Sequence, residues 1–130
     1  MNDIGLQKKL ENIGKYGCYF LSLLKAFKRT ADFLELYDKY TAKGWMDSDC
    51  YVKNPIDIVV DLSGYNKWNV EKTTTFKKGD IVIAYYFNKT TGLHHFVLFN
   101  NDNKLIWDSL GQSNTVRNGV IESYRVFTKY

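Results

Sequence analysis

The chain has 130 residues, of which 45% are hydrophobic and 16% aromatic, and it contains a single proline. This length and composition predict one globular domain and exclude a disordered chain. The net charge of +4 is spread along the sequence without a run of like charge, so we do not expect nucleic-acid binding. No apolar stretch approaches the roughly 20 residues of a membrane-spanning helix, so no membrane partner is expected.

The N-terminus and the two cysteines predict where the protein works and whether it binds metal. Residues 1–14 lack the apolar segment of a secretory signal, and two cysteines form no disulfide framework, so we expect a cytoplasmic protein with reduced thiols. The cysteine and histidine spacings do not fit a zinc site, and Asp47 and Asp49 lack the glycine and glutamate of a calcium loop. We therefore expect neither a metal nor a cofactor, and the oligomeric state stays open.

Residues 1–65 form the expected helical part of the domain. A weak helical spacing over residues 4–13 is followed by Gly14 and Gly17, which we expect to break the helix. Stronger patterns predict helices over 18–29, 31–44 and 55–62, with Thr30 and Asn54 as N-caps and Gly44 and Gly64 as C-terminal stops.

Residues 66–130 change from helical spacing to alternation of apolar and polar side chains, which is typical of strands. Short turns such as KKGD and NNDN separate the runs, and residues 111–119 read as a loop. The whole chain, 1–130, is thus predicted to be one α+β domain with helices first and an antiparallel sheet of about five strands after them. The strands are expected over 67–76, 81–87, 94–99, 104–110 and 120–130.

The hairpin over residues 94–110 suggests which of its side chains face each other. Its turn is centred on NNDN, residues 100–103, and a symmetric loop pairs positions whose numbers sum to 203. His95 then faces Asp108, with Cβ atoms roughly 5 Å apart on one face of the sheet. A three-residue loop would shift the pairing by one residue and separate the two side chains.

Together with Cys18, these two residues form a candidate catalytic triad. Cys18 follows Gly17 at the start of an apolar helix, where the helix dipole favours a thiolate. A histidine held by a carboxylate can take the proton of the thiol and later protonate the leaving group. We therefore expect Cys18 to be the nucleophile, His95 the base and then the acid, and Asp108 the group that orients His95 rather than a fold-stabilising residue.

Each of these residues also has a structural explanation. Free cysteines are among the most frequently buried residues, so Cys18 can simply pack in the core. His94 is expected to face Ser109 on the other side of the hairpin, in a structural or rim position. Cys50 is the rival thiol, and we expect it to pack rather than react. Its thiolate is disfavoured by three carboxylates nearby in the sequence, those of Asp47, Asp49 and Asp57.

Three segments resemble papain-like peptidases, amidases and bacteriocin-leader peptidases. GCYFLSLL (17–24) is similar to their cysteine helix, and FKKGDIVIAYY (76–86) resembles the start of a strand in the bacterial cell-wall members. HHFVLFNNDNKLIWDSLG (94–111) is similar to their histidine strand, turn and following strand that ends in Asp. The nearest likeness is to a family of uncharacterised phage- and plasmid-encoded proteins with GCYF and GW…CY…NP stretches, here GWMDSDCYVKNP (44–55).

The resemblance implies a papain-like fold and a cysteine hydrolase that cleaves an amide, peptide or isopeptide bond in a peptide or protein substrate. Papain-like enzymes often carry a glutamine about six residues before the nucleophile, which donates a hydrogen bond to the oxyanion. Asn12 occupies that position here and can donate with a shorter reach, and Gln7 is the alternative. Two other functions stay open: a catalytically inactive papain-like binding module of phage or plasmid origin, and an acyltransferase or transglutaminase-like enzyme with an amine acceptor.

Overall fold

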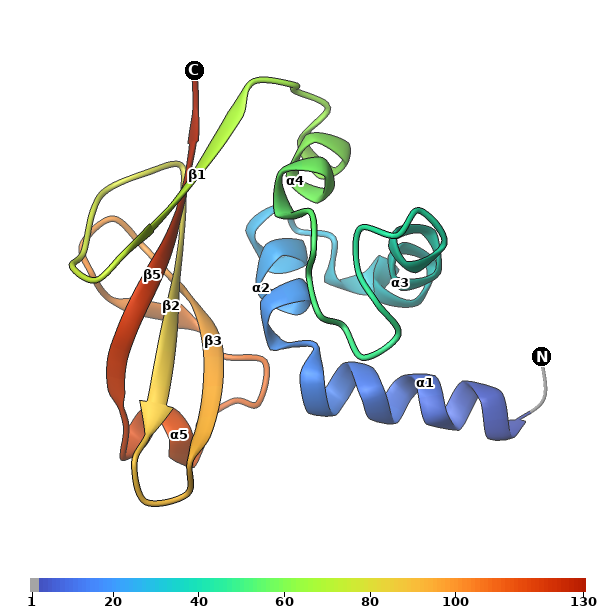
Figure 1. Ribbon diagram of the computed structural model, residues 1–130, viewed down its shortest axis with the longest axis horizontal. Coiled ribbons are helices and arrows are strands. Elements are labelled where there is room, and N and C mark those ends of the chain that lie inside the picture. Colours follow the sequence, from blue (N-terminus) through green and yellow to red (C-terminus); the bar gives the residue numbers. More distant parts are fainter. Residues whose placement is uncertain (1–2) are drawn as a thin grey trace.

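The computed structural model describes residues 3–130 and places a group of helices against one face of a five-stranded sheet (Figure 1). The predicted α+β class is therefore confirmed. Within these residues, none of the helices has both the length and the apolar character needed to cross a bilayer. The helices are α1 (Asp3–Tyr16), α2 (Cys18–Ala26), α3 (Phe33–Ala42), α4 (Pro55–Ser63) and α5 (Asn114–Arg117), with a 3₁₀ turn, η1 (Thr30–Asp32), before α3. The strands are β1 (Trp68–Thr73), β2 (Ile81–Asn88), β3 (Leu93–Phe99), β4 (Leu105–Trp107) and β5 (Val120–Lys129).

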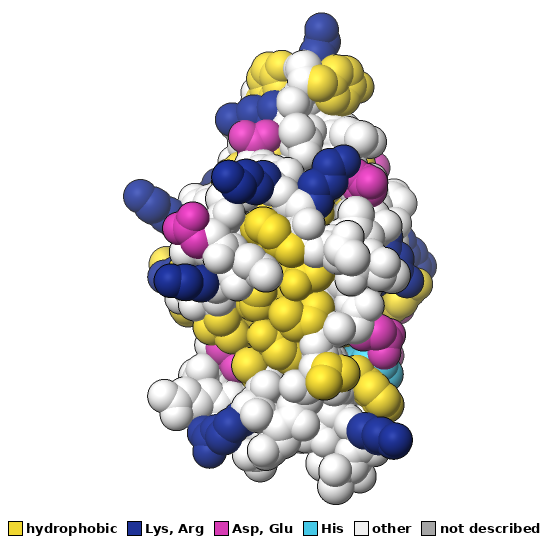
Figure 2. Space-filling view, turned by 90° about the vertical axis from the view of Figure 1, so that its left-hand side faces the viewer, with side chains coloured by type: hydrophobic (Ala, Val, Ile, Leu, Met, Phe, Trp, Pro, Cys, Tyr) yellow, Lys and Arg dark blue, Asp and Glu magenta, His cyan; other side chains and the backbone are white. Residues whose placement is uncertain are grey.

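The sheet has the order β1–β5–β2–β3–β4, and every neighbouring pair is antiparallel. Both faces of its centre are apolar, because β2 begins with four consecutive buried residues. One face packs on α2, whose buried side chains Phe20, Leu23 and Leu24 join the main core. The opposite face carries a second apolar layer, seen as a hydrophobic band in Figure 2. Its partly buried members are Phe76, Tyr86, Val116 and Ile121.

The helix boundaries differ from the prediction at three places. Helix α1 continues through Gly14 and ends only before Gly17. Thr30 does not cap a helix but opens η1, and the N-cap of α3 is Asp32, whose carboxylate pairs with Arg29 at 2.7 Å instead of capping. Helix α2 ends at Ala26 rather than near Arg29, because the chain turns at Phe27 and Lys28 adopts a left-handed conformation. Asn54 and Pro55 begin α4 as expected, and Gly44 and Gly64 follow their helices in the left-handed conformation.

Gly17 forms the tight junction between α1 and α2, directly before Cys18. Its N–H donates to the Ile13 carbonyl oxygen at 2.9 Å. A Cβ atom at this position would lie 2.4 Å from the same oxygen, so a larger residue must push the two helices apart. The glycine therefore fixes where the cysteine enters the structure.

We expect Gly17→Ala to lower the free energy of unfolding by roughly 2 kcal/mol, the usual cost of overpacking, and to lower the melting temperature by several degrees. Gly14→Ala is the matched control, because nothing lies within 4 Å of its Cβ position and it sits inside a helix. Alanine is favoured over glycine there by about 1 kcal/mol, so the control should be neutral or stabilising. Thermal unfolding of the two variants measures the difference, and equal melting temperatures would contradict the assignment.

The β3–β4 hairpin has a register that differs from the predicted one. Leu98 was expected opposite Leu105 but pairs with Trp107, and Phe99 pairs with Leu105. The register changes by one residue between these two pairs, which marks a bulge. The strand β4 is also shorter than predicted and ends before Asp108.

Two one-residue shifts explain the difference. In the turn, Asn100 donates its N–H to the Lys104 carbonyl at 2.9 Å and Asn103 adopts a left-handed conformation, so three residues form the loop. That loop alone would have moved His95 and Asp108 to opposite faces. The bulge adds a second shift of one residue. Because the combined shift is two residues, His95 and Asp108 return to the same face of the sheet. The predicted proximity of the two side chains therefore survives an incorrect register.

Candidate active site

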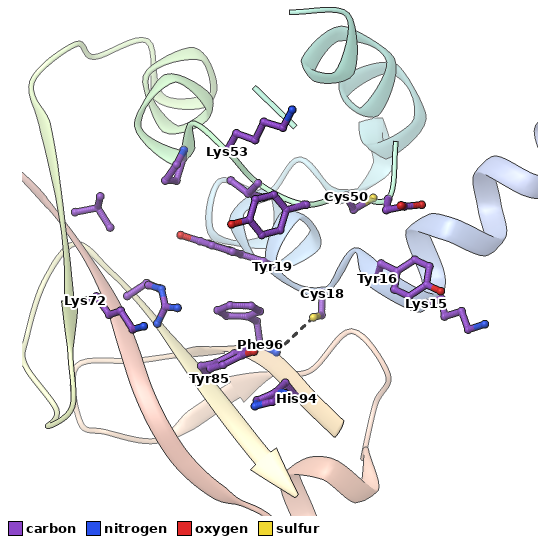
Figure 3. Close-up of a pocket in the computed structure, with 16 residues that line it drawn as sticks. Lys15, Tyr16, Cys18, Tyr19, Cys50, Lys53, Lys72, Tyr85, His94 and Phe96 are labelled. Atoms are coloured by element: carbon purple, nitrogen blue, oxygen red, sulfur yellow. Dashed lines mark hydrogen bonds between the residues drawn. The ribbon is translucent and has the colours of Figure 1, made fainter. Parts of the chain in front are cut away.

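Cys18 is the first residue of α2, and its sulfur lies at a free edge of β3. Because β4 ends at Trp107, it does not reach along β3 as far as Phe96. The Phe96 N–H instead donates to Cys18 Sγ at 3.4 Å (Figure 3). No side chain caps the N-terminus of α2, and the cysteine is partly exposed. The thiol thus combines a helix N-terminus, a backbone donor and access to solvent.

His95 lies on β3, and its ring contacts both other members of the predicted triad. Its Nε2 is 2.6 Å from Asp108 Oδ1, and the two side chains are 5% and 1% exposed. Burial alone would lower the pKa of His95, but hydrogen bonds with Cys18 and Asp108 and their charges raise it above its usual value. With Nε2 bound to the carboxylate, Nδ1 is the nitrogen left for the thiol. The structure therefore brings Cys18, His95 and Asp108 together, with a direct bond between His95 and Asp108 and with Cys18 near enough to raise the pKa of His95.

Asp108 follows β4 and accepts four hydrogen bonds. Besides His95, its carboxylate accepts from the Leu110 N–H at 2.9 Å, the Ser113 N–H at 3.2 Å and the Ser113 hydroxyl at 2.9 Å. Burial would raise the pKa of Asp108, but these bonds, led by the one with His95, lower it. Asp108 therefore holds the loop before α5 as well as the imidazole, whereas the sequence suggested only the second role. The loop prediction over 111–119 also missed α5, which Ser113 caps.

Cys50 packs in the core, as predicted for the rival thiol. It is 3% exposed, and burial together with Asp47 and Asp49 raises its pKa to about 12. Asp57, which the sequence grouped with these carboxylates, is instead in the first turn of α4. The loop that carries Cys50 is closed by the bridge between Met46 and Val52. The two cysteines thus have opposite environments.

The thiol of Cys18 opens into a cleft of about 770 Å³ between the helices and the sheet (Figure 3). Three neighbouring rings line it: Tyr19 stacks on Phe96 with centroids 4.5 Å apart, and Tyr85 lies tilted against Phe96 with centroids 4.3 Å apart. The charged residues of the lining are four cations and one acid, namely Lys15, Lys53, Lys72, Arg125 and Asp49. None of these aromatic or charged residues was predicted as a site residue.

The two oxyanion candidates do not line this cleft. The Asn12 amide donates to the Ser48 carbonyl at 3.3 Å and so ties α1 to the loop that carries Cys50. Gln7 is exposed on α1. An oxyanion role for either side chain stays a prediction, and for Asn12 it requires the bond to Ser48 to open.

His94 has surroundings unlike those of His95. Its ring stacks on Tyr85 at 4.8 Å and on Phe87 at 4.7 Å, and its Nε2 lies 3.6 Å from a Glu122 oxygen. The predicted partner Ser109 lies beyond the end of β4, so no pairing across the hairpin holds His94. His94 is a wall residue of the cleft.

One family model matches both the helical part and the sheet part of the chain. Residues 5–129 match the family described as "Protein of unknown function, DUF261". The chain belongs to the DUF261 family. The matched region includes Cys18, His95 and Asp108, so the whole candidate site lies within the DUF261 domain. Searches of curated proteins and of solved structures found no match.

The chemistry open to this DUF261 protein follows from its own side chains. In the part of the chain that the structure describes, no group of His, Cys, Asp and Glu side chains has an arrangement that could hold a metal ion. A thiol, an imidazole and a carboxylate do converge beside the cleft, and the carboxylate bonds the imidazole. A nucleophile, a base and a group that orients the base are the parts that covalent acyl transfer needs.

Proposed function

We propose that this DUF261 protein is a papain-like cysteine hydrolase that cleaves an amide, peptide or isopeptide bond in a peptide or protein substrate. The observation that carries the proposal is the convergence of Cys18, His95 and Asp108: the carboxylate bonds the imidazole at 2.6 Å, and the imidazole lies near enough to the thiol, which lines an open cleft, for Cys18 to raise its pKa. The arrangement of elements supports it further. The cysteine begins a helix that packs on an antiparallel sheet, the histidine lies on a strand, and the acid follows the next strand.

The chemistry proceeds through an acyl-enzyme. His95 Nδ1 takes the proton of Cys18, and the sulfur attacks the substrate carbonyl to form a tetrahedral intermediate. The protonated His95 gives that proton to the leaving amine as the carbon–nitrogen bond breaks, which leaves a thioester on Cys18. Water then attacks the thioester with His95 as base, and the acid product and free thiol are released. Asp108 stabilises the imidazolium at each stage and is not itself protonated.

The two other functions differ from hydrolysis in observable ways. A binding module without turnover would be favoured by a thiol sealed under aromatic side chains, whereas Cys18 is partly exposed and lines the cleft. An acyltransferase or transglutaminase-like enzyme would form the same thioester and pass the acyl group to an amine instead of water. The products therefore separate the two enzyme classes.

We expect the wild-type protein to generate new peptide termini from a random peptide library, and the Cys18→Ala variant to generate none. Mass spectrometry of the products, with and without an added primary amine, identifies cleavage or transfer. Hydroxylamine should release acyl groups from wild-type protein as hydroxamates, because it attacks thioesters. If the wild-type and Cys18→Ala proteins give the same peptide spectrum and no hydroxamate forms, the hydrolase proposal fails and the binding module is favoured.

A further inference from the structure

Two cations stand directly opposite each other on one wall of the cleft. Lys72 on β1 pairs with Arg125 on β5, and both side chains line the cleft. Among residues 3–130, neither has an Asp or Glu oxygen within 4.0 Å. Like charges directly across an antiparallel pair repel each other, so this arrangement costs stability unless an anion joins it.

The guanidinium of Arg125 is held in position by its surroundings. It lies 5.4 Å from the ring centroids of both Tyr85 and Phe96, which is within the range of cation–π attraction. Its Nη1 donates to the Ser123 hydroxyl at 2.7 Å, the one hydrogen bond recorded for this side chain in the described chain. A guanidinium has several N–H donors in a planar fork that matches a carboxylate. Most of that fork is therefore available to a ligand.

The same aromatic rings connect these cations to the nucleophile. The Phe96 ring lies under Arg125, while the Phe96 backbone N–H bonds the sulfur of Cys18. Figure 3 shows the rings of Phe96 and Tyr85 between Lys72 and Cys18. A substrate that reaches from the sulfur to the two cations must therefore lie across an aromatic surface.

The carboxylates on the two strands of this wall contact other residues. Glu71, next to Lys72 in the chain, pairs with Lys77 at 2.6 Å. Glu122 lies 3.6 Å from the His94 ring. The acid that lines the cleft, Asp49, belongs to the loop that carries Cys50 and not to the sheet. The positive wall is thus not neutralised from within the described chain.

We propose that Lys72 and Arg125 form an anion subsite for a carboxylate of the substrate, and that the substrate class is an acidic peptide. The carboxylate is separated from the scissile carbonyl by an apolar or flat group that packs on Tyr85 and Phe96. It comes from an acidic side chain or from the end of a peptide chain, and both present the same planar anion. The inference rests on the proposed function of Cys18 as the attacking group.

Electrophilic peptides test the subsite through the rate at which Cys18 is alkylated. Iodoacetyl peptides extend on one side of the electrophile and peptidyl chloromethyl ketones on the other, and each series carries one Glu, or Gln in its place, at successive positions. Free-acid and amide ends of otherwise equal iodoacetyl peptides distinguish a terminal carboxylate from a side chain. We expect the best acidic probe to react about ten times faster than its neutral twin, because a charge-assisted hydrogen bond to the carboxylate favours binding of the acidic probe.

Arg125→Gln should remove that preference, and Lys72→Gln should reduce it. Lys104→Gln, on the distant β3–β4 turn, should leave it unchanged, because Lys104 does not line the cleft. Neutral iodoacetamide should alkylate Cys18 at the wild-type rate in Lys104→Gln, and in every protein the ratio of acidic to neutral probe rates separates the charge preference from the reactivity of the thiol. Equal rates for acidic and neutral probes at every position, with Cys18 still reactive toward iodoacetamide, would overturn the subsite and leave the hydrolase proposal standing.

Calorimetry with the Cys18→Ala protein tests the anion subsite independently of the hydrolase proposal. The best acidic peptide, made without its electrophile, should bind more tightly than its glutamine twin and lose that advantage in Cys18→Ala/Arg125→Gln. This binding requires no reactive thiol, so it supports the subsite even if Cys18 proves inert and the hydrolase proposal fails. Equal heats for the acidic and neutral peptides would overturn it.

Discussion

Cys18 should react with iodoacetamide at neutral pH at least about 100 times faster than Cys50, and His95→Ala should slow the alkylation of Cys18 itself by roughly 100-fold. The expectation for Cys50 follows from a pKa of about 12, which leaves only a very small fraction of reactive thiolate. Cys18 instead has a histidine within hydrogen-bond reach that can accept its proton. General base catalysis of this kind is typically worth about 10²–10⁴ in rate. Mass spectrometry after timed labelling measures both cysteines in one sample.

His94→Ala is the matched control for this experiment, because it removes a neighbouring imidazole that stacks on Tyr85 and Phe87. Its Cys18 rate should stay within about twofold of wild type, since no hydrogen bond links His94 to the thiol in the described chain. If His94→Ala slowed the alkylation of Cys18 more than His95→Ala did, His94 rather than His95 would be the base. Equal, slow labelling of both cysteines in the wild-type protein would contradict the assignment of Cys18 as the nucleophile.

Much of the fold could be predicted from the sequence because its signals are local. The change from helical to alternating spacing near residue 65 separates α4 from β1, and Pro55 and Gly64 bound α4 as expected. The failures lie at helix ends, where single-residue rules are weak. Gly14 does not break α1, and Asp32, expected inside the helix over 31–44, pairs with Arg29 three residues before it and is the N-cap of α3.

The proximity of His95 and Asp108 could be predicted for a different reason: two side chains share a face of the sheet whenever the register is wrong by an even number of residues. The predicted register was wrong, yet His95 and Asp108 meet because the three-residue loop and the bulge shift the pairing by two residues together. The anchoring of the loop by Asp108 could not be predicted, since it depends on where Ser113 lies in space.

The pair of cations that lines the cleft could not be predicted from the sequence either. The alternation that turns Ile83 and Phe127 into the core turns Tyr85 and Arg125 to the same face of the sheet. That pattern does not reveal that β1 will place Lys72 beside Arg125, because the pairing of β1 with β5 joins distant parts of the chain. The hydrogen bond from the Asn12 amide to Ser48 could not be predicted for the same reason, because the two residues are 36 positions apart in the chain.

Asp108→Asn should slow alkylation of Cys18 at least roughly tenfold and also destabilise the protein by about 1–3 kcal/mol, because the carboxylate serves both His95 and the loop. Asp108 Oδ1 accepts from His95 and Leu110, and Oδ2 accepts twice from Ser113. An asparagine offers one oxygen and one NH₂ group, so it can satisfy only one side. If the NH₂ faces His95, it forces the proton onto Nδ1, which then cannot accept the proton of Cys18.

Ser113→Ala separates the two roles of Asp108. It removes the Ser113 hydroxyl bond to Oδ2 and the cap of α5 but leaves the 2.6 Å contact between His95 and Asp108 in place. We expect a similar loss of stability, about 1–2 kcal/mol, and a Cys18 alkylation rate like that of wild type. Urea unfolding and labelling on the same samples give both quantities. An Asp108→Asn protein that unfolds early yet keeps a fully reactive Cys18 would limit Asp108 to the loop and end its assignment to the triad.

The pH dependence of the unfolding free energy is an independent test of the interaction between His95 and Asp108. The pKa of Asp108 is lowered by folding, so its contribution is fully present above the unfolded value of about 3.9 and is lost as the pH falls through the lower folded value. The pKa of His95 is raised, so its contribution is present below about 6.5 and is lost as the pH rises through the higher folded value. The difference in unfolding free energy between wild type and Asp108→Asn should therefore be largest between about pH 4 and 6.5. Above that window a smaller difference should remain, because the charged carboxylate still accepts from Leu110 and Ser113. A difference that does not vary with pH would mean that the charges of His95 and Asp108 are not coupled in the folded protein.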